Sequence, residues 1–457
     1  MNLRAILAII LCKLLRLLSR LLHRGGTAMP GRYALKICPE LLGILAKNVK
    51  TVAITGTNGK TTSARMIEQA FLNEGKSYFS NRSGANLISG ITTEFVMNCT
   101  LGGKMKKEYA VIECDEAAST RVFSQLQPEV IVVTNLFRDQ LDRYGDVTHT
   151  LESIKKGIEG APHATVCVNA DCSLSSALAL ELPNKFIYFG IDKSAAGEHQ
   201  LSELSDASHC IRCKAQYEYS YISYGHLGGF RCPKCGYSRH DADYAVSDIV
   251  EQGMDYSEVI INIKGEKHLV RINLPAMYNI YNAVGSIAAI MEMGLSLQSA
   301  VMAMGDFKCG FGRMEKFDLG SGGAKIMLVK NPAGCNQVID FLQNLKESFS
   351  LVICLNDKAG DGTDISWIWD AELEGLSQMG GRLKNVIVSG DRAADMALAI
   401  KYAGIPEENI ILEKDYDKLV EWMAQQDKPV FIMPNYTAML EIRSHIVSRL
   451  GGADFWE

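Results

Sequence analysis

The sequence predicts an α/β protein, and three observations support this fold class. Short apolar runs that are typical of buried strands alternate with helix-like segments, which favours a sheet of parallel strands. A glycine-rich loop, residues 55–62, joins one such run to a helix-like segment. Of the 457 residues, 47% are hydrophobic and 22% are charged, which excludes a disordered chain, a collagen and a coiled coil. At roughly 150 residues per domain, the length predicts two to four domains.

The first 22 residues are very apolar but are interrupted by cations. The unbroken apolar run Ala5–Cys12 has eight residues, whereas a helix that spans a membrane needs about 20. Cations beyond the apolar block, and no cleavage site after it, argue against a signal peptide. On a helical wheel these cations (Lys13, Arg16, Arg20, Arg24) lie opposite the leucines (Leu11, Leu14, Leu15, Leu18, Leu22). Two interpretations are equally favoured: an amphipathic helix on a membrane or partner, and a helix buried against its own chain with its cations extended to water.

The central domain is predicted to cover residues 45–308, after an N-terminal helix and lead-in at residues 1–44. Helices are predicted at Leu41–Lys47, Thr61–Leu72 and Asn279–Met293. The predicted strands are Val49–Thr55, Tyr109–Glu113, Val130–Thr134, Ala164–Val168 and Lys185–Tyr188. Residues 205–240 break this alternation because they are rich in Cys, Tyr and Gly, and we interpret them as an insertion.

A second α/β domain is predicted at residues 309–457, beginning with the linker Cys309–Gly312. Its predicted strands are Lys325–Lys330, Leu351–Leu355, Val386–Ser389, Ile410–Leu412 and Val430–Met433.

The loop at residues 55–62 has the layout of a phosphate-binding site. Gly56 and Gly59 allow backbone N–H groups to converge on phosphate oxygens, and the start of a helix adds partial positive charge. Lys60 is expected to reach the β- and γ-phosphates, and the Thr61 hydroxyl to hold Mg²⁺. The spacing GxxGKT is shorter than the general GxxxxGK[ST] pattern. The strand before, the helix after and the GKTT letters together make an ordinary glycine turn improbable.

Four cysteines form two CxxC pairs. Cys210 and Cys213 are separated from Cys232 and Cys235 by eighteen residues, a spacing that matches a four-thiolate zinc ribbon. Because four protein ligands leave no open position, we expect a structural Zn²⁺; a redox dithiol is the minor alternative. The insertion has no basic cluster and the net charge is −5, so we expect no nucleic-acid partner. The thirteen cysteines, with two CxxC pairs among them, favour a reducing compartment and hence the cytoplasm.

These motifs resemble the Mur ligases and folylpolyglutamate synthases. GTNGKTT at residues 56–62 is similar to the ATP loop of that family, and other family motifs follow in the family's order. The further matching segments are Val111–Glu116, Thr134–Gly145, Pro275–Asn282 and Gly312–Glu315. The resemblance covers roughly residues 45–440 and implies a Mur-ligase-like central domain that binds ATP and Mg²⁺. It implies ATP contacts at Gly56, Thr57, Asn58, Gly59, Lys60, Thr61, Thr62, Asn282 and Arg313, and Mg²⁺ ligands at Thr61 and Glu113.

At several positions the sequence departs from the general Mur ligase motifs, and these departures indicate a particular branch of the family. Gln140 stands where the family has a metal-binding His. Ala276 stands where the family has a Gly, and Tyr278 stands where it has a His. With the cysteine insertion and the C-terminal sequence, these departures resemble the MurT family, the ligase subunits of lipid II isoglutaminyl synthase. Some relatives carbamylate a lysine to hold a second metal. Lys155 or Lys156 lies near that place, but Gln140 leaves a second metal undecided.

The C-terminal segment Leu355–Asp370 carries four aspartates after a predicted strand. Taken alone, it is best read as a solvated loop with an Asp cap. The MurT resemblance implies instead that one Asp completes the Cys–His pair of a partner glutaminase, GatD. We choose Asp364 for that role, with Asp361 as second choice.

The resemblance implies an ATP-dependent carbon–nitrogen ligase of peptidoglycan synthesis. It would amidate the D-glutamate α-carboxylate of lipid II to D-isoglutamine through an acyl-phosphate, with ammonia from the GatD-type class I glutaminase. The alternative is an amino-acid-adding ligase of the Mur or folylpolyglutamate synthase type. A lipid-linked substrate would bring this cytoplasmic chain to the inner face of the membrane, where the N-terminal helix could make a peripheral contact.

Overall fold

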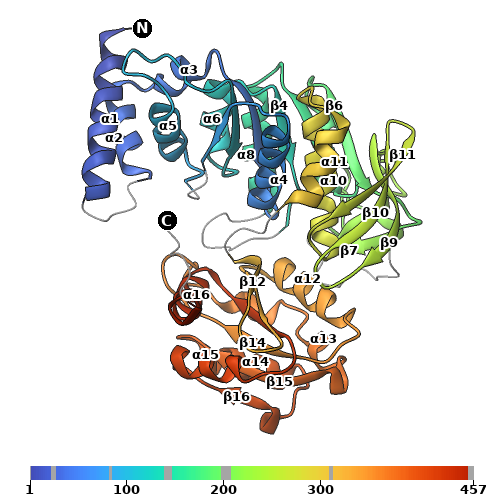
Figure 1. Ribbon diagram of the computed structural model, residues 1–457. Coiled ribbons are helices and arrows are strands. Elements are labelled where there is room, and N and C mark those ends of the chain that lie inside the picture. Colours follow the sequence, from blue (N-terminus) through green and yellow to red (C-terminus); the bar gives the residue numbers. More distant parts are fainter. Residues whose placement is uncertain are drawn as a thin grey trace.

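The fold was taken from a computed structural model, which describes residues 2–21, 27–81, 85–137, 147–196, 207–307 and 312–450. Two α/β sheets follow one another along the chain, as the sequence predicts (Figure 1). The predicted linker Cys309–Gly312 falls mostly outside the described residues, as do Leu22, Arg24 and Gln140. The predicted domain boundaries therefore stay predictions.

A nine-stranded sheet forms the centre of the first unit, in the order β11-β10-β9-β6-β5-β4-β1-β3-β2. Neighbours from β9 to β2 are parallel, and β10 and β11 extend the sheet antiparallel to β9. The strands are β1 (Lys50–Thr55), β2 (Tyr78–Ser80), β3 (Tyr109–Glu113), β4 (Val130–Val133), β5 (Thr165–Asn169), β6 (Phe186–Ile191), β9 (Tyr244–Gln252), β10 (Ser257–Ile263) and β11 (Glu266–Ile272). The central strands are buried on both faces, which explains their continuous Val and Ile runs.

Helices cover this sheet, and α10 is the most deeply buried of them. Every residue of α10 from Asn279 to Ile290 is buried, and it packs against α4 and α11. The helices of this unit are α3 (Leu41–Ala46), α4 (Lys60–Asn73), α5 (Ile88–Met97), α6 (Ser119–Leu126), α8 (Val147–Glu159), α9 (Ser173–Ser176), α10 (Met277–Glu292) and α11 (Leu297–Asp306). The Cys-rich insertion contributes the hairpin β7 (Glu218–Tyr224) and β8 (Leu227–Arg231), which forms its own two-stranded sheet.

A six-stranded sheet forms the second unit, in the order β12-β13-β17-β14-β15-β16. All its neighbours are parallel except the pair β12–β13. The strands are β12 (Arg313–Phe317), β13 (Ala324–Met327), β14 (Phe349–Cys354), β15 (Leu383–Ser389), β16 (Ile410–Leu412) and β17 (Val430–Pro434). The helices are α12 (Pro332–Gln343), α13 (Glu374–Ser377), α14 (Ala393–Tyr402), α15 (Tyr416–Ala424) and α16 (Tyr436–Leu450).

Two N-terminal helices, α1 (Leu3–Leu21) and α2 (Met29–Ile37), pack together and on α5, at one end of the central sheet (Figure 1). The buried side of α1 consists of small or short residues: Ala5, Ala8, Ile9, Cys12 and Ser19. Of the two interpretations of this helix, the one with its leucines packed against its own chain does not hold for those leucines, although the helix itself packs on α2 and α5. Leu14 and Leu18 are exposed, whereas Lys13 Nζ donates to the Cys99 carbonyl at 2.8 Å. Small side chains let the helix axes approach closely, which leaves the long leucines outside. None of the helices within the described ranges has the length and apolarity that crossing a bilayer requires.

Candidate active site

The glycine-rich loop lies between β1 and α4 and has two left-handed glycines. Gly56 has φ of +116° and Gly59 has φ of +89°. A Cβ on Gly59 would lie 2.0 Å from Asn282 Oδ1, and one on Gly56 would lie 2.4 Å from Thr134 Oγ1. Glycine is therefore required at both places by backbone angle and by space. The loop and the predicted contact residue Asn282 are brought together by this packing.

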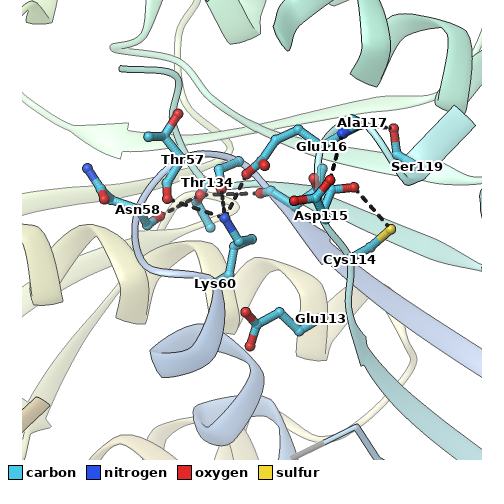
Figure 2. Close-up of polar contacts among 12 residues, drawn as sticks. Thr57, Asn58, Lys60, Glu113, Cys114, Asp115, Glu116, Ala117, Ser119 and Thr134 are labelled. Carbon is cyan, nitrogen blue, oxygen red and sulfur yellow. Dashed lines mark hydrogen bonds and ion pairs between the residues drawn. The ribbon is translucent and has the colours of Figure 1, made fainter. Parts of the chain in front are cut away.

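Residues that follow β4 form hydrogen bonds to the loop, and Figure 2 shows Thr134 of this segment beside Asn58. The Asn58 carbonyl accepts from Thr134 Oγ1 at 2.7 Å and from Asn135 Nδ2 at 3.2 Å, while the Asn58 N–H donates to Asn135 Oδ1 at 3.1 Å. The Thr57 hydroxyl donates to the Phe137 carbonyl and accepts from the Phe137 N–H. Because these bonds use the buried Thr57 side chain, this residue could offer a nucleotide only its backbone.

Lys60 forms a nearly buried ion pair that the sequence does not predict. Its Nζ lies 2.7 Å from Glu116 Oε1 and donates to the Gly56 carbonyl at 2.6 Å. The two side chains are only 12% and 7% exposed. Figure 2 shows Lys60 directed into the loop toward Glu116, which follows β3. A lysine ammonium held inside a glycine loop fits a triphosphate, which would replace the carboxylate as its anionic partner.

The predicted magnesium ligands meet directly beside this ion pair. Thr61 Oγ1 donates to Glu113 Oε2 at 2.8 Å. Asn81 fixes the end of β3, because it accepts from the Glu113 N–H at 2.9 Å and donates to the Glu113 carbonyl at 2.7 Å. A hydroxyl and a carboxylate are the oxygen donors that Mg²⁺ prefers, so this pair fits the ion. Lys155 instead forms an ion pair with Glu181, and Lys156 is exposed.

A cavity between the two α/β units opens onto the loop. Its central-domain wall includes Asn58, Gly59, Thr62 and Asn282, and its other wall includes Lys330 and Asn331. Asn331 Nδ2 donates to Asn58 Oδ1 at 3.4 Å across the interface, and Asn331 Oδ1 caps α12 by accepting from the Gly334 N–H. The predicted contact Arg313 opens β12, next to Met314 of the cavity wall; its side chain lies outside the described residues. The cavity thus joins the phosphate loop to the C-terminal unit.

Ala276 precedes α10 with φ of +77° and ψ of 145°, a backbone region that is essentially restricted to glycine. Ala276 thus has a backbone conformation suited to glycine, the residue that the general Mur ligase motif has at this position. The neighbouring Tyr278 lines the interdomain cavity.

The four cysteines of the insertion converge as predicted. All four Sγ atoms lie within 4.8 Å of one another. The Sγ atoms of Cys210 and Cys235 are 3.5 Å apart, and those of Cys213 and Cys232 are 3.4 Å apart. Both distances are close to the sulfur–sulfur distance of about 3.8 Å in a tetrahedral zinc–thiolate site. The Cys235 N–H donates to Cys232 Sγ, a contact that stabilises a thiolate. The donor set and spacing fit Zn²⁺.

Two aspartates of the C-terminal segment Leu355–Asp370 differ in burial and in hydrogen bonding. Asp361 is buried, and both its oxygens accept from Thr437, one from the N–H at 2.7 Å and one from the hydroxyl. Asp364 is exposed, and its Oδ1 accepts from the Ser366 N–H at 2.8 Å. That hydrogen bond lowers the pKa of Asp364, whereas burial raises the pKa of Asp361. An ionised, surface carboxylate is therefore available at Asp364.

Comparison with known proteins places the chain in a family. Residues 54–290 match the Mur ligase middle domain and residues 328–439 match the MurT ligase C-terminal domain. The subunit MurT of lipid II isoglutaminyl synthase (glutamine-hydrolyzing) from Streptococcus pneumoniae is 34% identical over 451 residues, 98% of each chain. The same subunit from Staphylococcus aureus is 34% identical over 433 residues, 94% of this chain and 95% of that one.

A solved structure supports the same fold. The MurF ligase from Thermotoga maritima in complex with ADP aligns with a TM-score of 0.61 at 14% identity, covering 91% of this chain and 85% of that chain. The matches cover both α/β units and agree with the motifs at the loop and the C-terminal segment. The chain therefore belongs to the MurT family of Mur-type, ATP-dependent ligases.

Proposed function

We propose that this chain amidates the D-glutamate α-carboxylate of the lipid II stem to D-isoglutamine, using ATP and ammonia from a GatD-type class I glutaminase subunit. The single observation that carries the proposal is the nearly buried Lys60 ammonium, held in a glycine loop that opens onto the interdomain cavity. The names of its relatives supply the substrate and indicate a partner, since they are subunits of a glutamine-hydrolysing synthase.

The residues of the loop fit a nucleotide and a metal ion in defined roles. The backbone of residues 56–62 and Lys60 would hold the triphosphate, with Asn282 packed against the loop, and Thr61 and Glu113 would hold Mg²⁺. A bound Mg²⁺ ion supplies charge neutralisation to the phosphoryl group during its transfer. Lys60 supplies the same neutralisation from the protein.

The chemistry follows from the poor reactivity of a carboxylate. Transfer of the γ-phosphoryl group to the substrate carboxylate gives an acyl-phosphate and ADP. Ammonia then attacks the acyl carbon, the C–O bond to phosphate breaks, and amide and inorganic phosphate are released. Lys330 and Asn331 face the loop across the cavity, so this wall can exclude the water that would hydrolyse the acyl-phosphate.

The test uses the purified chain with ATP, Mg²⁺, ammonium chloride and lipid II. We expect phosphate release and amide formation from the native chain and neither from Lys60→Ala. Lys47→Ala, which removes an exposed lysine outside the loop, is the matched control and should keep both. Full activity of Lys60→Ala would refute the proposed site.

A second arm separates amidation from amino-acid addition. Free amino acids replace ammonium in the same assay, with product mass as the readout. A product that contains an added amino acid, and none that contains an amide from ammonia, would instead support the amino-acid-adding ligase.

A further inference from the structure

An apolar stripe on α1 faces away from the protein. Seven large aliphatic side chains of this helix are between 37% and 71% exposed. They are Leu3, Leu7, Ile10, Leu14, Leu17, Leu18 and Leu21. At 100° per residue they fall within an arc of about 100°, the width of a face that normally packs on a core. Here the opposite side of the helix is the one that is buried.

Charge accompanies this stripe on both of its sides. The exposed Arg4 lies beside one edge of the arc, and the exposed Arg20 lies beyond the other. The first 39 residues contain seven Arg and Lys residues and no Asp or Glu. Because the whole chain has a net charge of −5, the remaining residues carry −12. The positive charge is thus concentrated in the segment that exposes the leucines.

The neighbouring helix α2 extends the same composition. Met29 and Tyr33 are each 45% exposed, and the ammonium of Lys36 lies 5.2 Å from the centre of the Tyr33 ring. Arg32 is exposed beside them. A surface that combines leucines, a tyrosine and cations, in a 39-residue segment whose sequence contains no Asp or Glu, is complementary to an anionic bilayer, in which acyl chains lie beneath phosphate groups.

A groove of about 510 Å³ lies next to α1, whose Arg16 forms part of its wall. It runs beside edge strand β2 and is lined by three cations, Arg16, Lys76 and Lys107, with one carboxylate, Glu94. Ser80 also lines it, and the next residue, Asn81, fixes the backbone of Glu113. The wall of this groove is therefore largely cationic, which adds to the positive charge beside α1.

We propose that the exposed face of α1, extended by Met29 and Tyr33 of α2, docks on an anionic lipid bilayer, with the leucines at the acyl-chain boundary and the arginines at the phosphates. The helix lies along the surface and does not cross it. The proposal rests on the proposed function only in that a lipid-linked substrate gives this docking a purpose; the binding itself is measured without substrate.

The test is co-flotation of the full chain with vesicles that contain phosphatidylglycerol in phosphatidylcholine, compared with phosphatidylcholine alone. We expect binding to the first, weakened by high salt, and much less binding to the second. Leu7→Gln/Leu14→Gln should reduce binding by about tenfold or more, because two buried aliphatic groups are lost. Arg4→Gln/Arg20→Gln should reduce binding only to the anionic vesicles.

The matched control is Leu180→Gln/Leu398→Gln, which replaces two leucines of similar exposure outside α1 and should bind like the native chain. Absence of native binding, or equal loss in this control, would overturn the proposal. Analytical sedimentation of all variants tests whether a second copy of the chain, instead of a bilayer, covers this face. If Leu7→Gln/Leu14→Gln converts an oligomer to a monomer and vesicles never bind, the face is an interface between copies.

Failure of docking and failure of the proposed function are distinguished by a lipid-free analogue of the substrate. If docking is right, Leu7→Gln/Leu14→Gln keeps ATP-dependent amidation of that soluble analogue but loses rate on lipid II in vesicles. If the variant instead keeps the native rate on lipid II in vesicles as well as on the soluble analogue, the docking proposal is overturned and the amidation proposal stands.

Discussion

Lys60 Nζ, in the glycine-rich loop, lies 2.7 Å from Glu116 Oε1 of the segment after β3, and both side chains are nearly inaccessible to solvent. A triphosphate would therefore compete with Glu116 for the same ammonium. Replacing Glu116 by Gln should destabilise the free chain by about 2 kcal/mol, because a buried cation loses its charged partner.

The same variant should respond more strongly to nucleotide. We expect the rise in melting temperature caused by saturating ADP and Mg²⁺ to be larger for Glu116→Gln than for the native chain, measured by scanning calorimetry. Glu108→Gln, which changes an exposed carboxylate ahead of the same strand, is the control. An unchanged nucleotide shift would mean that Glu116 does not compete with the ligand.

Ala276 offers a stabilising substitution. Its φ of +77° and ψ of 145° lie in a region that costs a residue with a Cβ about 1–3 kcal/mol, and glycine there pays no such cost. After the greater freedom of glycine in the unfolded chain is subtracted, Ala276→Gly should stabilise by about 1 kcal/mol. Urea unfolding measures this. Ala397→Gly, inside α14, should destabilise by a similar amount because its backbone is helical.

The sequence predicts the α/β class and most of the central strands, since their apolar runs are buried on both faces. It predicts the meeting of the four cysteines because CxxC spacing constrains each pair locally. The extension of the sheet by β10 and β11 was not predicted. Their alternating burial is the pattern of an antiparallel edge, which a search for continuous apolar runs does not find.

Side-chain pairing was the least predictable part of the site. Glu116 lies in a segment with three acidic residues, and only the fold shows that it, rather than Glu113, pairs with Lys60. Asn331 reaches Asn58 across 273 positions of sequence, and no local pattern indicates this contact. The orientation of α1 also depended on tertiary packing, because the small residues that face inward are separated from their partners in sequence.

The cysteine cluster predicts a measurable metal content. We expect about one Zn²⁺ per chain by elemental analysis, in line with a closed four-thiolate site. Cys213→Ser should lose most of this metal and lower the melting temperature, because Tyr217, Phe230 and Tyr237 pack around the cluster. Cys335→Ala, which changes a buried cysteine of the C-terminal unit, should keep the zinc. Equal metal content in both variants would contradict the site.

Glu292 predicts a pH dependence of stability. Burial opposes its ionisation, but hydrogen bonds from Lys185 at 2.6 Å and Lys264 at 3.2 Å outweigh burial, so the pKa of Glu292 lies below its ordinary value of 4.5. A carboxyl with a lowered folded-state pKa stabilises the fold above pH 4.5, and this contribution is lost as the pH falls through the folded-state pKa.

Glu292→Gln should therefore cost about 1 kcal/mol at pH 7, a modest value because both lysines are more than half exposed. The difference from the native chain should shrink below pH 4.5, as measured by urea unfolding across pH. Glu266→Gln, at a carboxylate that is 84% exposed, should show little difference at either pH. A difference for Glu292→Gln that stays constant with pH would contradict this account.

Substitutions at Asp364 and at Asp361 are expected to differ in their effect on the glutamine-dependent reaction that we propose. A carboxylate that orients a partner's histidine must be ionised and accessible, and Asp364 is exposed with a pKa lowered by the Ser366 N–H. Asp364→Asn should reduce the glutamine-dependent rate by a factor on the order of 10³–10⁴ and leave the ammonia-dependent rate unchanged. Asp361→Asn should leave both rates unchanged and lower only the stability of the fold, because Asp361 already accepts hydrogen bonds from Thr437 inside the chain. If Asp361→Asn selectively removed the glutamine-dependent rate and Asp364→Asn did not, the assignment would pass to Asp361, which would then have to leave Thr437 when the partner binds.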